Sequence, residues 1–141
     1  FKADPRLMAK LRRETTIPIA AGSSGTYDLA YLREYFIHEA IDICQPNVRD
    51  IGGFTGALHA AGLAQAFNIQ HEMGGNFPHL NMHLHAGVPN GGRVEFHLGG
   101  WALGEALFDG MPKPQKGFVT LTDAPGLGFT PKSGILDLAA K

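Results

Sequence analysis

The chain has 141 residues, 44% of them hydrophobic and 18% charged, with a net charge of −1. This composition is typical of a globular domain and argues against disorder. The longest basic run, Arg12-Arg13, is too short for a nucleic-acid interface, and no apolar run reaches the roughly 18 residues of a membrane helix. The single cysteine, Cys44, is predicted to be a buried hydrophobic residue. Without a disulfide framework, we expect a cytoplasmic protein that binds neither nucleic acid nor membrane.

Strand-like and helical segments alternate along the first hundred residues. The predicted strands cover residues 17–21, 41–44, 67–70 and 93–96. The predicted helices cover residues 29–36, with Thr26 or Asp28 as the N-cap, then 53–66 and 78–86. This alternation favours parallel strands joined by right-handed helical crossovers, an α/β fold.

The pattern changes after residue 96. Residues 101–107 fit a short helix, residues 117–122 an exposed strand, and residues 124–129 a loop rich in Pro and Gly. Four strand–helix units are half of a (β/α)₈ barrel, and a half barrel would leave bare strand edges. We therefore expect strands 5–8 of such a barrel, followed by a tail, in an incomplete chain.

One polar residue stands at or just beyond each predicted strand. These residues are Ser23, Asn47, His71 and Glu95, and successive members are 24 positions apart. In a parallel barrel all strands end on the same face, where catalytic groups gather. The spacing therefore predicts one shared site, although four ordinary strand-end polar residues would give the same pattern.

Several stretches, in this order, resemble the barrel of the enolase superfamily, in its mandelate racemase/muconate lactonizing enzyme-like branch. Residues 17–22 resemble its fifth strand, and residues 45–48 with 52–55 resemble its sixth strand and the next helix start. His71 falls at the position of a histidine after the seventh strand. Residues 81–83 and 94–97 resemble the eighth-strand region, and residues 117–119 and 125–128 resemble the C-terminal tail.

The resemblance implies residues 1–100 as the C-terminal half of the barrel domain and residues 101–141 as a tail toward a capping domain, with the first half of the barrel missing. It also implies Mg²⁺-dependent abstraction of the proton next to a carboxylate, in acid-sugar dehydration or a related racemisation. A small carboxylate or acid sugar would be the substrate, and a homo-oligomer is expected. The usual Lys base and other metal ligands would lie in the missing half.

The resemblance assigns roles residue by residue. His71 would be the general base, or the general acid in dehydration, because the pKa of histidine lies near working pH. Asn47 stands where an Asp usually pairs with that histidine, so it would orient the ring without supplying charge. Glu95 would hydrogen-bond the substrate carboxylate. The simpler alternatives are a loop histidine, a strand-terminating amide and a strand glutamate paired with a neighbour.

Ser23 departs from the family pattern. It follows residues 17–22 at the position of a Glu that ligates Mg²⁺, and a serine hydroxyl is a poor ligand for that ion. The substitution supports an alternative function, a degenerate superfamily member that acts as a non-catalytic binding or scaffold protein. His79 and His83, four residues apart on a predicted helix, have the spacing of a transition-metal pair, but a structural role is the simpler interpretation.

Overall fold

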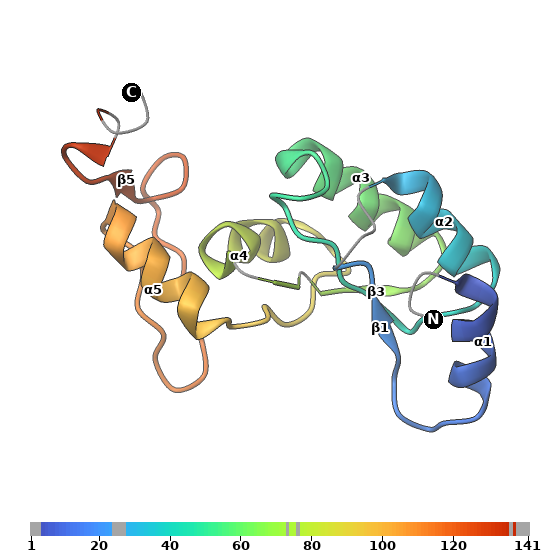
Figure 1. The fold of residues 1–141 in the computed structure, drawn as a ribbon. Helices are drawn as coiled ribbons and strands as arrows, with labels where there is room; N and C mark the ends of the chain where they lie inside the picture. The colour runs from blue at the N-terminus through green and yellow to red at the C-terminus, as the bar shows by residue number, and fades with distance from the viewer. Residues whose placement is uncertain (1–3, 24–27, 73, 76, 136, 138–141) are drawn as a thin grey trace.

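The computed structural model describes residues 4–23, 28–72, 74–75, 77–135 and 137. The helices are α1 (Pro5–Arg13), α2 (Leu29–Ile37), α3 (Gly53–Ala66), α4 (Pro78–Gly87) and α5 (Leu98–Leu107). The strands are β1 (Ala20–Ala21), β2 (Ile43–Cys44), β3 (Gln70–His71), β4 (Phe108–Asp109) and β5 (Thr130–Pro131). Figure 1 shows α1, α2 and α3 around the β1–β3 sheet, with α5 and β5 on the far side of α4. Within the described residues no helix is both long and apolar enough to cross a membrane.

The first three strands form a parallel sheet in chain order. Ala21 pairs with Cys44, and Cys44 pairs with His71. A further parallel bridge joins His71 to Gly91, where the His71 amide donates to Asn90 and the Gly92 amide donates to His71, each at 2.9 Å. The predicted alternation of helices with parallel strands is therefore confirmed.

Three predicted strands are wrong in detail. The strand expected at residues 67–70 shares only Gln70 with β3, because Phe67 caps the end of α3 and Asn68 has a left-handed φ of 56°. The fourth strand was expected at residues 93–96, but its pairing to β3 lies at Gly91 because β3 itself ends at His71. Burial still alternates along residues 92–97 as it does in an extended chain. Val94 and Phe96 are half-buried, while Arg93 and Glu95 are exposed. Residues 117–122 form no strand; a single bridge joins residues 115 and 118, and the antiparallel pair in this part of the chain is β4–β5.

The helices follow local signals in the sequence. The Asp28 carboxylate caps α2 by accepting the Tyr31 amide at 2.7 Å, whereas Thr26 lies outside the described residues. Helix α2 buries Leu32, Tyr35 and Phe36. Helix α3 has the predicted bounds, and its buried residues are all alanines, so its backbone can approach its neighbours closely. Helix α1, which the sequence analysis did not identify, begins at Pro5 after an Asp4 cap.

The core falls into two hydrophobic clusters. The larger one packs α1, α2 and α3 against the parallel sheet and includes the fully buried Cys44, as predicted. The smaller one is centred on Met82, Trp101 and Phe129 and joins α4 and α5 to the C-terminal segments. Leu80 contacts both. Helix α5 runs across residue 100, and the division of domains at that residue stays a prediction.

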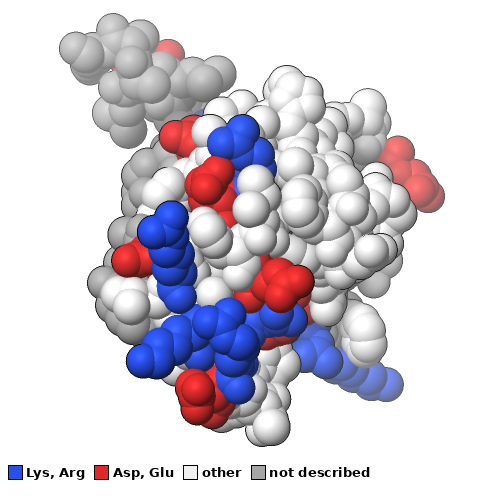
Figure 2. Space-filling view, turned by 90° about the vertical axis from the view of Figure 1, so that its right-hand side faces the viewer, with Lys and Arg blue, Asp and Glu red and all other residues white. Residues whose placement is uncertain are grey.

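Acidic and basic side chains are interspersed on the face that carries α1 (Figure 2). The Asp42 carboxylate accepts from the Arg12 side chain at 2.8 Å and from the Ile19 amide at 2.8 Å. Burial raises the pKa of Asp42, but these bonds outweigh it and hold that pKa below its ordinary value. This pair ties α1 to the start of β2, at the end of the sheet opposite to the predicted site.

Candidate functional site

Polar side chains meet beyond the carboxyl ends of β2 and β3, around the peptide that joins Gly74 and Gly75. The Asn47 amide donates to the Gly74 carbonyl at 2.8 Å, and its oxygen accepts the Arg49 backbone N–H at 2.9 Å. Asn47 is 2% exposed. Both ends of its side chain are therefore used to hold backbone, which fixes the connection after β2 against the connection after β3.

Glu95 reaches the same peptide from the extended segment after Gly91. Its Oε2 accepts the Gly75 backbone N–H at 2.9 Å. A Cβ built on Gly74 would lie 3.1 Å from Glu95 Oε2 and 3.1 Å from Ser23 Cβ, so Ser23 and Glu95 flank one point. Ser23, Asn47 and Glu95 thus lie together, as the 24-residue spacing predicted.

A fourth member was missed by the sequence analysis. Asn81 on α4 is fully buried, its amide donates to the Gly74 carbonyl at 3.3 Å, and its oxygen accepts the Val48 N–H at 3.2 Å. The resemblance put residues 81–83 in the eighth-strand region, but they lie on helix α4. The two adjacent glycines after a strand, Gly74 and Gly75, were the available signal in the sequence, because their flexible backbone can be held in place by a side chain. We call Ser23, Asn47, Asn81 and Glu95 the strand-end group.

His71 is not brought into this group. Successive strand residues point to opposite faces; Gln70 and Glu72 bond each other on one face at 2.9 Å, and the His71 ring lies toward α4, 5.8 Å from the His85 ring. The ring is fully buried, and neither nitrogen has a hydrogen-bond partner within the described residues. The predicted Asn47–His71 pair is therefore absent, and the Asn47 side chain bonds to Gly74 at the strand ends instead.

Burial also changes the acidity of His71. Its pKa falls to about 4, first because burial disfavours the charged ring and second because His85 is close. A neutral ring can accept a proton in principle, but a base with this pKa is weak near neutral pH. The catalytic role of His71 stays a prediction, and the arrangement around its ring gives that role no support.

Three more histidines, His79, His83 and His85, lie on α4. His79 and His83 do share a face, since each ring centroid lies 6.0 Å from that of Phe129. Burial lowers the pKa of both; His83 lowers that of His79 further, and a bond to the Leu127 backbone opposes the shift at His83. We call His71, His79, His83 and His85 the histidine group. Aromatic neighbours favour a packing role for the His79–His83 pair.

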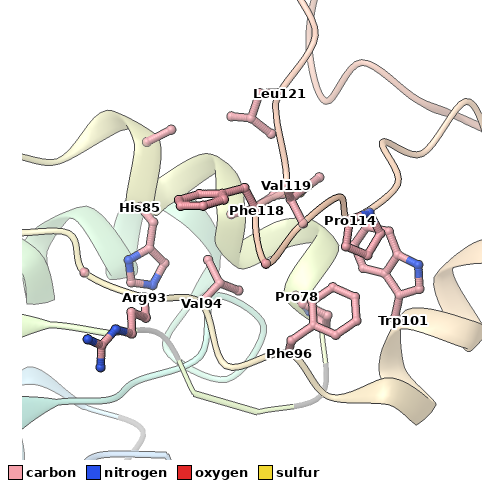
Figure 3. A pocket seen from close by; sticks show the side chains of 14 residues that line it. Pro78, His85, Arg93, Val94, Phe96, Trp101, Pro114, Phe118, Val119 and Leu121 are labelled. Atoms are coloured by element: carbon pink, nitrogen blue, oxygen red, sulfur yellow. The ribbon is translucent and has the colours of Figure 1, made fainter.

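One cavity lies away from the strand-end group. A hollow of about 620 Å³ opens between α4, residues 92–96 and residues 114–121, lined by apolar side chains with His85 and Arg93 at one edge (Figure 3). Val94 and Phe96 face this hollow, so the exposed Glu95 between them points the other way. The hollow belongs to the packing of α4 and α5, and the strand-end group lies on the opposite face of the segment.

A metal ion is a separate question. In the part of the chain that the structure describes, no three His, Cys, Asp or Glu side chains are grouped to hold one. Glu95 is the only carboxylate of the strand-end group, and Mg²⁺ prefers several carboxylate and water oxygens. The residues present therefore do not make a magnesium site by themselves, and Ser23 as a ligand stays a prediction.

Comparison with known proteins gives the family. Residues 1–135 match the model of the enolase C-terminal domain-like family. The chain is 29% identical over 139 residues to arabinonate dehydratase of Saccharolobus solfataricus, which covers 93% of this chain and 36% of that protein. The chain thus spans about a third of the length of the curated relatives it matches.

Solved structures agree with this match. A mandelate racemase/muconate lactonizing enzyme superposes with a TM-score of 0.85 at 27% identity, covering 98% of this chain and 37% of that one. L-talarate dehydratase from Polaromonas sp. JS666, solved with Mg and L-glucarate, superposes with a TM-score of 0.83 at 26% identity, covering 94% and 36%. The parallel strands and crossover helices described above are thus part of a larger known architecture. The chain belongs to the enolase superfamily, and its fold is that of the mandelate racemase/muconate lactonizing enzyme-like C-terminal region.

Proposed function

We propose that the whole protein removes the proton next to the carboxylate of an acid sugar, in a Mg²⁺-dependent dehydration or a related racemisation. One observation carries the proposal: Glu95, Ser23 and Asn47 gather at the carboxyl ends of parallel strands, where barrel enzymes keep their active sites. Relatives named as arabinonate and L-talarate dehydratases support the substrate class.

Glu95 is the residue of this chain that we assign to the substrate. A backbone N–H holds its Oε2, which leaves Oε1 for a ligand. Removing a proton next to a carboxylate builds negative charge on that carboxylate, and a hydrogen bond aimed at the charge lowers the barrier. A Glu95 carboxyl that carries a proton on Oε1 would donate such a bond.

Mg²⁺, when bound, would polarise the substrate carboxylate. Its support is the magnesium reported in similar solved structures, and the ligands would come largely from outside the described residues. We leave His71 out of the assignment because its ring is buried toward α4.

The test is deuterium exchange at the carbon next to the carboxylate, followed by NMR for a panel of acid sugars with the whole protein. We expect exchange with at least one of them, and Glu95→Leu should slow it by about a hundredfold, the typical effect of losing one donor to a developing anion. Leu98→Gln, an exposed change three residues away, is the control. No exchange with any sugar, at saturating Mg²⁺, would sink the proposal.

A second function has its own observation. Ser23 stands where the family pattern has a carboxylate, and the Asn47 amide is fully occupied by backbone. These features favour a degenerate, non-catalytic binding or scaffold protein. Calorimetric titration with Mg²⁺ separates the two: a catalyst should bind the ion and Ser23→Glu should bind it more tightly, whereas a scaffold should bind none and exchange no proton.

A further inference from the structure

One peptide group connects three parts of the strand-end group. The carbonyl of Gly74 accepts from the side-chain amides of Asn47 at 2.8 Å and Asn81 at 3.3 Å. The N–H of the same peptide belongs to Gly75 and donates to Glu95 Oε2 at 2.9 Å. The two amides and the carboxylate therefore hold opposite ends of one rigid unit.

The planarity of the peptide couples these ends. In a trans peptide the C=O and N–H bonds point in opposite directions, and the group turns only as a whole. Two donors on the carbonyl thus fix where the N–H points. Donors on the carbonyl also polarise the peptide and strengthen its N–H as a donor. Without them, two adjacent glycines would leave this peptide free to rotate.

Asn81 differs from Asn47 in what it ties together. It is fully buried on α4, and its oxygen holds the Val48 N–H after β2 while its amide holds Gly74 after β3. A side chain fixed by a helix is a firmer reference than one within the loop itself. Asn81 therefore sets the position of both connections relative to α4.

We propose that Asn81 is a positioning residue: it holds the Gly74–Gly75 peptide so that the Gly75 N–H fixes Glu95 Oε2 and leaves Oε1 turned to a ligand. Asn81 touches no substrate and acts only through this peptide. The positioning of Glu95 stands on the contacts alone, and its effect on catalysis rests on the proposed function.

The test is hydrogen exchange at the Gly75 amide in the whole protein, resolved to single residues. Asn81→Leu removes both hydrogen bonds and should speed that exchange about tenfold, the equivalent of one hydrogen bond. Asn90→Leu is the matched control. Asn90 also donates from its side chain to two backbone carbonyls, those of Ala61 and Ile69, but its replacement should leave Gly75 exchange within about twofold.

If Asn81→Leu does not fold, Asn81→Asp replaces it, because the carboxylate keeps an acceptor for Val48 and loses the donor to Gly74. Unchanged Gly75 exchange in a folded variant, or an equal change in Asn90→Leu, overturns the proposal. On an active enzyme, Asn81→Leu should lower kcat about tenfold with little change in KM. An inactive wild-type protein would defeat the proposed function, but the Gly75 readout would still decide the role of Asn81.

Discussion

The strand-end group and the histidine group hold their polar atoms in different ways. In the strand-end group, neutral amides and one carboxylate are held by backbone. In the histidine group, rings that can titrate are packed against aromatic side chains, and burial lowers the pKa of each. Histidine, the residue type with the more familiar catalytic chemistry, thus lies in the group whose surroundings suit catalysis less.

The difference arises within three residues at the end of β3. His71 and Gly74 are three residues apart, so a residue that points toward α4 and one that lies at the strand ends are easily confused in a sequence. The residue at the strand ends is Gly74, whose side chain is a hydrogen atom. The chemistry there therefore depends on side chains that come from other elements. Whether a titratable residue forms a site depends on its direction and its partners.

The largest effect expected is from Gly75→Ala. Gly75 has a φ of +94°, and a Cβ there would lie 2.6 Å from Asn47 Nδ2. We expect a loss of about 3 kcal/mol in the free energy of unfolding, from backbone strain and the displaced Asn47 together. Gly117→Ala is the control, because φ is +84° but no atom lies within 4 Å, so about 1 kcal/mol is expected. Equal losses in denaturant titrations would show that the strand-end group is not tightly packed.

Acid should destabilise the histidine group. The pKa of His71 and of His85 is about 4 in the folded chain, against 6.5 for the free side chain, so the unfolded chain binds more protons between these values. Stability is therefore full above about pH 6.5 and falls as the pH drops toward 4, by on the order of 2 kcal/mol per ring at pH 5.

Urea titrations of the whole protein from pH 7 to pH 5 measure this loss. His71→Phe should flatten the pH dependence, because it removes one of the titrating rings. Leu84→Ala, a buried change on the same helix, should lower stability by a similar amount at every pH. A His71→Phe variant with the wild-type pH dependence would mean that the ring is charged or solvated in the folded protein.

The sequence predicted the architecture more closely than the site. Periodicity and capping predicted α2, where Asp28 caps a helix whose apolar residues recur at helical spacing, and a run rich in Ala and Leu predicted α3, because those signals are local. The parallel order followed from the alternation of strands and helices. The strand at residues 93–96 was misplaced because its position depends on a partner, and β3 offers pairing only at His71.

Within the site, the spacing predicted that Ser23, Asn47 and Glu95 would meet. Their shared anchor, the Gly74–Gly75 peptide, was marked in the sequence only by two adjacent glycines, which do not show which side chains bond to the backbone there. Asn81 was hidden for a related reason: a buried amide on a helix resembles an ordinary polar residue until its two backbone partners are known. The burial of His71 depends on the face of the sheet to which its side chain points, and a two-residue strand specifies that face weakly.

Asn47→Asp should have a moderate effect, and it tests the two groups against each other. The change removes the donor to the Gly74 carbonyl and sets a carboxylate oxygen against it. We expect a loss of about 2 kcal/mol in unfolding free energy. Asn68→Asp, at an exposed asparagine, should stay within about 0.5 kcal/mol. A family-like pair with His71 would instead shift the pH–rate profile upward without loss of stability, and that result would reunite His71 with the strand-end group.

Ser23→Ala should have the smallest effect on stability and is the most specific to ligand binding. Ser23 is half-buried at the rim of the strand-end group, and the change keeps the Cβ that flanks Gly74. Removing a rim hydroxyl should alter the free energy of unfolding by no more than about 0.5 kcal/mol. If that hydroxyl faces the substrate or an ion, KM or the Mg²⁺ affinity should change several-fold while thermal unfolding stays the same. A stability loss as large as that of Asn47→Asp would instead make Ser23 another support of the backbone, and Glu95 would be the one member of the group left to meet a ligand.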